Sequence, residues 1–298
     1  MSDKNFDVVV YGASGFTGKL VVEYLHQRYG DDQNFSWALA GRSQEKLTSV
    51  RDELGISKDV PVLIVDSNDE SSVIEMVTQT KCVLTTVGPY QLYGQNIIKQ
   101  CAQHGTDYVD LCGEPGWMHE MINEYSKQAE ETGARIVFSC GFDSIPFDLG
   151  VFFLQKEVIA KHGKPASSIR GRVRAMNGEF SGGTAASLGA TMASLKKKPE
   201  LFEVLANPFA LSNGFVGPEQ PRDHKPIFDE KLETWVAPFF MAPINTKNVH
   251  RSNALMGHMY GEDFCYNEMW IQGPGEDGKA AAEFVGKTNP LADAPEPG

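Results

Sequence analysis

Three glycines stand three residues apart, at positions 12, 15 and 18, in the stretch DVVVYGASGFTGKL. The residues before them are apolar and β-branched, as in a buried strand, and those after them have the spacing of an amphipathic helix. Residues without a Cβ let the backbone approach a pyrophosphate closely, and the first amides of the helix then face its negative charge. The stretch predicts a dinucleotide-binding turn, although its spacing is G-x-x-G-x-x-G rather than G-x-G-x-x-G.

The turn offers six residues as cofactor contacts. They are Gly12, Ser14, Gly15, Phe16, Thr17 and Gly18. The alternative is a glycine-rich connection between strand and helix that binds nothing.

Further cofactor contacts are expected where the next strands end. NAD-binding enzymes place a carboxylate at the end of the second strand, but here the strand ends in Gly41, Arg42 and Ser43. A guanidinium and a hydroxyl suit a 2′-phosphate, so NADP is favoured over NAD, unless Arg42 is only a solvated loop charge. Asp66 ends the third strand and either accepts from the adenine amino group or caps a helix.

A further turn follows the fourth strand, in the stretch TTVGPY. It lies at the edge of the sheet where nucleotides bind, so we expect it to shape the chain beside the central part of the cofactor. Its contact residues are Val87, Gly88 and Pro89.

The first half of the chain alternates short apolar runs with amphipathic stretches. Such repeated β-α units predict an α/β fold with an N-terminal, Rossmann-type doubly wound parallel sheet. Helical spacing is seen in Phe16, Leu20 and Tyr24 and in Val21 and Leu25. The strands are expected at 7–11, 37–40, 62–65, 83–87, 108–111 and 136–139.

The second half predicts a smaller mixed α/β domain for substrate binding or dimerisation. The expected domain limits are 1–146, 147–290 and a disordered tail over 291–298. Within the second domain we expect a helix over 148–160, a strand over 169–176, a long loop over 207–230, and strand alternation again in DFCYNEMWIQ.

After Trp270 the sequence offers at best a two-turn helix, Lys279–Val285, to cover this sheet. The sequence therefore predicts a C-terminally truncated domain with an exposed sheet edge, or a homo-oligomer that covers the edge.

Composition excludes several classes of function. The chain has 298 residues and a net charge of −12, which opposes binding to nucleic acid phosphates. Five cysteines without a C-x-x-C pair, and scattered histidines, indicate neither a disulfide framework nor a metal site. The N-terminus lacks the layout of a secretory signal and no apolar run is long enough to span a membrane, so we expect a cytoplasmic protein.

Several motifs in their order along the chain make it similar to the saccharopine dehydrogenase-like oxidoreductases, a group that includes trans-acting enoyl reductases. The resemblance implies an NADP-type domain followed by a mixed α/β domain, and a chain that usually continues further than this one. It does not imply saccharopine chemistry. The motifs are YGASGFTG, AGRS, VGPY…YG, YVDLCGE, CGFDSIPFDLG, SGGT, NPFAL, PFFMAPINTKNVHRSNAL and YGEDFCYNE.

Candidate catalytic residues should follow the strands near the nicotinamide, because the cofactor supplies the hydride and the protein supplies orientation and a proton donor. Tyr93 and Asp143 are the residues we select, although each could be structural. Glu114, which precedes Pro115, could instead cap a helix. Ser144 could cap the helix that starts near Pro146. Tyr90 and Asp110 are further candidates, as is the glycine-rich stretch 180–187.

The sequence lacks the tyrosine four residues before a lysine that short-chain dehydrogenases require. The function predicted is an NADP(H)-dependent oxidoreductase that reduces a C=C (enoyl) or C=N bond of a hydrophobic or acyl-linked substrate. The alternative is a catalytically silent dinucleotide-binding protein with a regulatory or membrane-peripheral role. In that case the apolar stretch 145–154 could contact lipid, although a buried interdomain helix is favoured.

Overall fold

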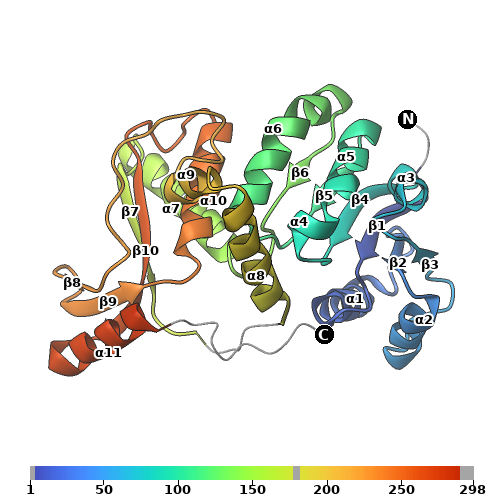
Figure 1. Cartoon of the computed structure of the whole chain (residues 1–298), viewed down its shortest axis with the longest axis horizontal. Coiled ribbons are helices and arrows are strands. Elements are labelled where there is room, and N and C mark those ends of the chain that lie inside the picture. The colour runs from blue at the N-terminus through green and yellow to red at the C-terminus, as the bar shows by residue number, and fades with distance from the viewer. Residues whose placement is uncertain (1–3, 177–181, 289–298) are drawn as a thin grey trace. The chain divides into compact units, whose positions relative to one another are not determined.

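The computed structural model describes residues 4–176 and 182–288 (Figure 1). These residues form two compact units. The first extends to Gly141 and also includes Ala186–Thr191, and the second begins at Phe142 and holds the other described residues. The domain boundary after residue 146 stays a prediction.

The first unit is a six-stranded parallel sheet in the order β3-β2-β1-β4-β5-β6. The order reverses between β1 and β4, whose carboxyl ends therefore lie at the point where such sheets bind nucleotides. The predicted doubly wound fold is confirmed. The strands are β1 (Phe6–Tyr11), β2 (Trp37–Gly41), β3 (Val62–Ile64), β4 (Thr80–Thr85), β5 (Asp107–Val109) and β6 (Ile136–Val137).

Six helices connect these strands, and Figure 1 shows them around the sheet. Several end at a glycine in the left-handed conformation, as α5 does at Gly105 and α6 at Gly133. The helices are α1 (Phe16–Tyr29), α2 (Gln44–Glu53), α3 (Glu70–Thr78), α4 (Tyr90–Tyr93), α5 (Gln95–His104) and α6 (Pro115–Thr132).

Helix α1 has apolar residues on more than one face, and the structure shows which face is buried. Its buried residues are Gly18, Val22 and Leu25. Because Gly18 must face the turn, the helix face that carries Gly18, Val22 and Leu25 packs on the sheet, and the opposite face points outward. That opposite face holds Phe16, Leu20 and Tyr24, which are 76%, 52% and 59% exposed.

The second unit contains a four-stranded mixed sheet in the order β7-β10-β9-β8. Strand β10 pairs parallel with β7 and antiparallel with β9, and β9 pairs antiparallel with β8. The predicted mixed α/β domain is confirmed. The strands are β7 (Ser168–Val173), β8 (Ile227–Asp229), β9 (Thr234–Pro238) and β10 (Cys265–Gly273).

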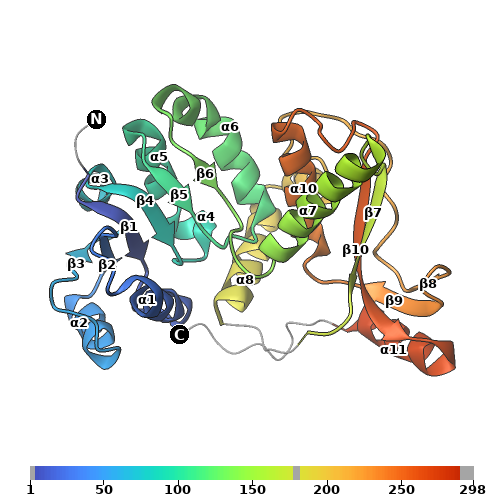
Figure 2. The ribbon, with the colours of Figure 1, turned by 180° about the vertical axis from the view of Figure 1, so that it is seen from behind.

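The helices of the second half pack on one another and on this sheet. Helix α7 contacts α10, and α10 contacts β10 (Figure 2). Although a buried helix was favoured for 145–154, α7 leaves Leu149, Phe153 and Leu154 exposed. The helices are α7 (Ile145–His162), α8 (Gly182–Lys197), α9 (Leu201–Ala206), α10 (Ala242–Leu255) and α11 (Gly275–Lys287).

The prediction of only a two-turn helix after Trp270 is wrong. Helix α11 has 13 residues and packs against β9 and β10, with the Lys279 ammonium 5.7 Å from the ring centre of Trp235. Two acidic residues in its first turn, Glu276 and Asp277, favour a helix start there because they face the positive end of the helix dipole. Helix α11 of the chain itself thus covers the part of the sheet formed by β9 and β10.

The predicted loop over 207–230 contains no helix or strand until β8 begins at Ile227. Buried polar residues of α10 hold it in place. The Arg251 guanidinium donates to the Leu211 carbonyl at 2.7 Å, and His250 Nε2 lies 3.1 Å from Gln220 Oε1. The first bond satisfies a backbone carbonyl that a connection without secondary structure leaves unpaired, and the second joins two side chains.

No helix in the described part of the chain is long and apolar enough to cross a membrane.

Gly18→Ala is expected to destabilise the first unit. A Cβ at this position would lie 2.9 Å from Ala13 Cα and closer still to the Gly12 carbonyl oxygen, so the helix would have to move away from the turn. We expect a loss of about 1–3 kcal/mol in the free energy of unfolding, measured by urea denaturation. Gly15→Ala is the control, because a Cβ there meets only the Gly12 carbonyl oxygen, at 3.4 Å. Equal stability of both variants would contradict the packing argument.

Candidate nucleotide-binding site

The glycine turn lies against the residues that follow β4. Gly12 has a φ of +91°, which favours glycine, and a Cβ there would come within 2.7 Å of Val87 Cγ2 and 2.8 Å of Thr86 Oγ1. Thr86 N also donates to the Tyr11 carbonyl at 3.0 Å. The structure therefore brings two predicted parts of the site together, the glycine turn and the turn at 87–89.

The N-terminus of α1 is open to a phosphate group. Gly15 is its N-cap in an extended conformation, no side chain of the described residues caps it, and its first turn holds no acidic residue. Gly15 and Phe16 are exposed, and Ser14 and Thr17 are half-buried. The first amides of a helix lack partners within the helix and carry partial positive charge, so they suit an anion.

The carboxyl end of β2 presents Arg42, which is exposed. Ser43 next to it is the N-cap of α2, where its hydroxyl accepts from Lys46 N at 3.3 Å. That hydroxyl keeps its own proton and can still donate to a phosphate. No carboxylate follows the strand before Glu45, which is consistent with a 2′-phosphate site.

Asp66 does not cap α3, which corrects one of the two interpretations of this residue. The N-cap is Asp69, whose Oδ1 accepts from Ser71 N at 3.1 Å, whereas Asp66 Oδ1 accepts from Asn68 N at 2.9 Å. Asp66 closes the loop after β3 and remains half-buried at the same edge of the sheet. Its contact with adenine stays a prediction.

A buried carboxylate fixes the backbone that follows the cis Gly88–Pro89 peptide. Glu114 Oε1 accepts from Tyr90 N at 2.9 Å, and Oε2 accepts from Gln91 N at 3.0 Å and from Gln91 Nε2 at 2.9 Å. Glu114 is the N-cap of α6 by position, but its side chain binds the N-terminus of α4 instead. The sequence identified this residue but not its partner, because the contact joins segments 23 residues apart.

Tyr90 and Asp110 have structural partners. The Tyr90 hydroxyl donates to the Thr85 carbonyl and accepts from Leu111 N, both at 3.3 Å, and its ring stacks on Trp117. Asp110 accepts from the Tyr108 hydroxyl, from Cys112 N and from Ser139 N, while burial raises its pKa to about 7. Both residues hold the ends of β4 and β5 in place.

Part of α8 belongs to the first unit and lies beside the same backbone. Thr191 Oγ1 accepts from Gln91 Nε2 at 3.4 Å, and Ser187 Oγ would lie 3.7 Å from a Cβ on Gly88. The sequence singled out the stretch 180–187, which includes Ser187, but nothing in it pointed to Thr191, whose placement depends on tertiary contacts. Of the glycine-rich stretch 180–187, residues 180 and 181 lie outside the described residues.

The two selected catalytic residues belong to different units. Tyr93 ends α4 in the first unit and is half-buried. Asp143 precedes α7 in the second unit, where it is exposed and partial desolvation raises its pKa. Ser144 is the N-cap of α7, but its hydroxyl donates to Asn245 Oδ1 at 2.8 Å rather than capping the helix. The catalytic roles of Tyr93 and Asp143 stay predictions.

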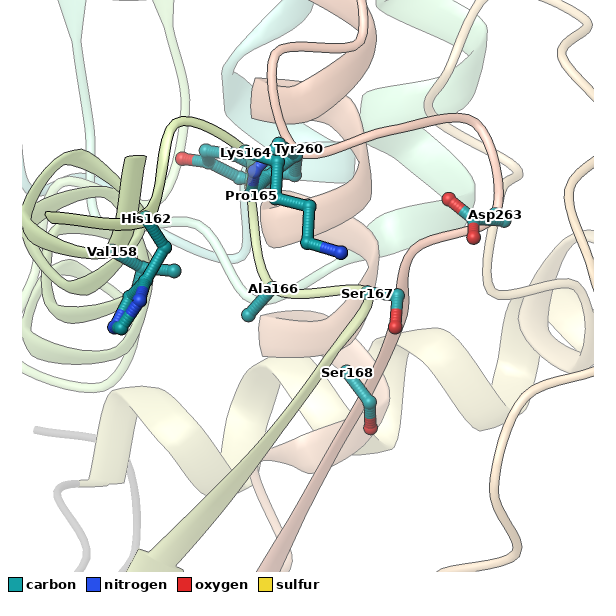
Figure 3. A pocket seen from close by; sticks show the side chains of 9 residues that line it. All are labelled: Val158, His162, Lys164, Pro165, Ala166, Ser167, Ser168, Tyr260 and Asp263. Atoms are coloured by element: carbon teal, nitrogen blue, oxygen red, sulfur yellow. The ribbon is translucent and has the colours of Figure 1, made fainter. Parts of the chain in front are cut away.

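A pocket of about 670 Å³ lies in the second unit, at the end of α7. Figure 3 shows the residues around it, which include His162, Lys164, Tyr260 and Asp263. None of the residues predicted to bind the cofactor or to take part in catalysis lines it. It is therefore distinct from the candidate nucleotide site.

Comparison with known proteins agrees with this geometry. Residues 8–137 match the family model of the saccharopine dehydrogenase NADP binding domain. The match covers most of the first unit. The resemblance inferred from the motifs and the cofactor class, NADP(H), are thereby confirmed.

Curated relatives match most of the chain. The protein Rv2449c of Mycobacterium tuberculosis is 41% identical over 274 residues, which cover 89% of this chain and 65% of that protein. The trans-acting enoyl reductase of Mycobacterium ulcerans is 37% identical over 277 residues, covering 90% of this chain and 66% of the relative. The chain thus spans a little under two thirds of the length of these relatives.

Among solved structures, the saccharopine dehydrogenase (L-Glu forming) of Saccharomyces cerevisiae matches with a TM-score of 0.44 and 16% sequence identity. The match covers 56% of this chain and 34% of that one.

Gly15→Val is expected to abolish binding of NADP(H) and to leave the fold intact. The Cβ position at Gly15 is open apart from the Gly12 carbonyl oxygen, so the added methyl groups occupy the space that a phosphate must enter. Calorimetric titration measures the affinity, and circular dichroism measures the fold. Gly150→Val, at an open glycine of the second unit, serves as the control. Near-native affinity of the Gly15 variant would place the cofactor elsewhere.

Glu114→Gln is expected to loosen the backbone at Tyr90 and Gln91. In the variant, at least one of the donors that now bind the carboxylate would face the NH₂ group of glutamine, which cannot accept a hydrogen bond. A hydrogen bond to a charged group is worth about 1.5–3 kcal/mol. We expect faster amide exchange at these two residues and weaker NADPH binding. Glu130→Gln, at an exposed position of the same helix, is the matched control. Unchanged exchange at Tyr90 and Gln91 would show that the contact is dispensable.

Proposed function

We propose that this chain is an NADPH-dependent reductase that acts on the C=C bond of an enoyl group in a hydrophobic, acyl-linked substrate. The observation that carries the proposal is the match of about nine tenths of the chain to proteins named trans-acting enoyl reductases, together with the match of residues 8–137 to an NADP-binding domain. The matched region includes both units, so it extends beyond the part that binds nucleotide.

The residues of the first unit fit the cofactor by their chemistry. The amides at the start of α1 suit the pyrophosphate, Arg42 and Ser43 suit the 2′-phosphate, and Asp66 suits the adenine amino group. Val87, Gly88 and Pro89 would lie beside the central part of the cofactor, held by Glu114 through α4. When bound, NADPH supplies a hydride to the β-carbon of the enoyl group.

The protein must then supply a proton to the α-carbon and stabilise negative charge on the thioester or ester oxygen. Asp143 has a raised pKa and is exposed, so it is a suitable proton donor. Tyr93 offers a hydroxyl at the end of α4, where it could donate a hydrogen bond to the developing oxyanion. The two residues are assigned complementary roles on this basis.

The substrate is proposed to be carried by a partner, because the word trans-acting in the names of the relatives describes proteins that act on the product of a separate enzyme.

A homo-oligomer is a further proposal. Strand β7 pairs with β10 alone among the described strands, so its other edge is available to a second copy of the chain. The exposed apolar residues of α7 are the feature that would contact a membrane surface in the silent-protein alternative.

The test of the proposed activity is oxidation of NADPH in the presence of a panel of enoyl thioesters. We expect turnover with long-chain acyl groups, and a loss of about 10²–10⁴-fold in kcat for Asp143→Asn if this residue is the proton donor. Tyr93→Phe is tested in the same assay. Tight NADPH binding with no turnover on any thioester or imine substrate would favour the silent dinucleotide-binding alternative.

Arg42→Ala is expected to remove most of the preference for NADP(H) over NAD(H). The loss of a charged hydrogen bond to the 2′-phosphate should cost about 1.5–3 kcal/mol for NADP(H) and leave NAD(H) affinity unchanged. Calorimetry with both cofactors measures the difference. Lys46→Ala removes an exposed positive charge from neighbouring α2 and controls for the overall field. Equal affinity of the wild-type protein for both cofactors would overturn the assignment of Arg42.

A further inference from the structure

A chain of buried hydrogen bonds crosses the second unit and ends at the first turn of α7. The Tyr266 hydroxyl donates to Glu268 Oε1 at 2.7 Å, and Asn245 Nδ2 donates to Glu268 Oε2 at 2.9 Å. The Ser144 hydroxyl donates to Asn245 Oδ1 at 2.8 Å. The chain thus connects β10, α10 and the start of α7.

All four side chains are shielded from solvent. Glu268 is 0% exposed, and Ser144, Asn245 and Tyr266 are at most 4% exposed. Within the described residues Glu268 forms no ion pair, so its charge is balanced by neutral donors alone. A buried carboxylate of this kind binds a proton more readily than one in water, and desolvation raises the pKa of Glu268 to about 7.

The charged groups around Glu268 come from several elements. Asp223, in the segment before β8, repels its negative charge. The charge of Asp148 in α7 acts to raise the pKa of its partner Tyr266, and the charge of Arg172 in β7 acts to lower it. On α10, Lys247 donates to the carbonyls of Leu205 and Pro243, and burial lowers its pKa to about 8, so it titrates above Glu268.

Two of these groups have partners of their own. The Asp148 carboxylate accepts from the Ser252 hydroxyl at 3.0 Å, and Arg172 pairs with Asp229 at 2.9 Å. His250 on α10 lies beside Gln220, and burial lowers its pKa to about 4, so it is neutral at the pH where Glu268 titrates. Glu268 is therefore the group in this chain of hydrogen bonds whose charge changes near neutral pH.

We propose that Glu268 is a positioning residue whose protonation state sets, through the amide of Asn245, the direction in which the Ser144 hydroxyl donates. The link to catalysis rests on the proposed function, because Ser144 follows the candidate proton donor Asp143. The hydrogen-bond change itself does not depend on it.

The reason lies in the donors and acceptors available. Ionised Glu268 accepts from both Tyr266 and Asn245, and the amide oxygen of Asn245 accepts from Ser144. When Glu268 binds a proton on Oε2, that oxygen becomes a donor and faces the NH₂ group of Asn245, which cannot accept. Rotation of the amide by half a turn places its oxygen toward Glu268 and its NH₂ group toward Ser144. The Ser144 hydroxyl then accepts from this NH₂ group and donates its own proton to a different acceptor.

Protonation on the other oxygen is the competing route. There Glu268 would donate to the Tyr266 oxygen, and the phenol proton would need a new acceptor. A phenol hydroxyl prefers the plane of its ring, whereas a serine hydroxyl turns freely about its single bond. The route through Asn245 and Ser144 therefore requires less rearrangement of the core.

The test follows the side chains of the isotope-labelled full chain by NMR across about pH 5 to 9, a range that spans the shifted carboxyl. We expect the Glu268 carboxyl carbon and the Asn245 side-chain amide signals to titrate with one midpoint. In Glu268→Gln, which keeps the shape of the side chain, the Asn245 signals should no longer change with pH. In Tyr266→Phe they should still change.

Two results would overturn the proposal. One is a titration of Glu268 that leaves the Asn245 amide signals unmoved. The other is loss of the Asn245 response in Tyr266→Phe while Glu268 still titrates, which would assign the change to the phenol. Both are read from the protein without cofactor or substrate.

The activity measurement is separate. If the proposed reductase activity is found, Glu268→Gln and Ser144→Ala should both remove a limb of the kcat–pH profile near the Glu268 midpoint while leaving KM for NADPH unchanged. A profile that keeps this limb in both variants would overturn the link to catalysis. Absence of any reductase activity would contradict the proposed function, and the NMR titration would still decide the hydrogen-bond change.

Discussion

The close approach of α1 to the turn at Gly12 is the constraint on which the nucleotide site depends. Gly18 lies so near the Gly12 carbonyl that no larger residue fits, and this contact fixes both the depth and the rotation of the helix. The rotation directs Val22 and Leu25 to the sheet and leaves Phe16 exposed beside the turn. The same contact brings the uncapped amides at the start of α1 next to the carboxyl ends of β1 and β4, where a dinucleotide binds in this fold.

Buried carboxylates serve different purposes in the two units. Glu114 accepts from backbone amides at the start of α4, which cannot turn away, so it fixes the loop that contains Gly88 and Pro89. Glu268 accepts from a phenol and a side-chain amide, groups that can rotate and exchange their roles as donor and acceptor. A carboxylate bound by fixed amides holds a backbone in place, whereas one bound by rotatable side chains can respond to a proton.

The second unit depends on polar residues in its interior to a degree that its sequence does not suggest. Helix α10 buries the polar residues Asn245, Lys247 and His250 together with the apolar Ile244 and Val249. Lys247 donates to the Leu205 carbonyl at 2.7 Å, and burial lowers its pKa to about 8. Two further residues of α10 contact the long connection before β8. The Arg251 guanidinium donates to the Leu211 carbonyl, and His250 bonds the side chain of Gln220, so this segment without helix or strand is tied to α10.

The sequence by itself determined the elements of the first unit and the chemistry of its turn. Alternating apolar runs and helical spacing are local signals, and glycines at 12, 15 and 18 have a local reason, so both could be read without the fold. Arg42 favoured NADP(H) on a local signal of the same kind, the type of residue at a strand end, and its contact with the 2′-phosphate stays a prediction. The ordered motifs added the family, since many short matches in one order are specific even where each is weak.

Tertiary structure alone decided which residues meet. Glu114 meets Gln91, which is 23 residues away, and Ser144 meets Asn245, which is 101 residues away. Asn245 of α10 in turn meets Glu268 on β10. The spacing alone left open which face of α1 is buried, and the close contact at Gly18 decided it. The length of α11 was misjudged because packing on a sheet outweighs the weak local preference of a short segment. Spacing along a chain reports periodicity, whereas the pairing of buried polar groups depends on how distant segments fold together.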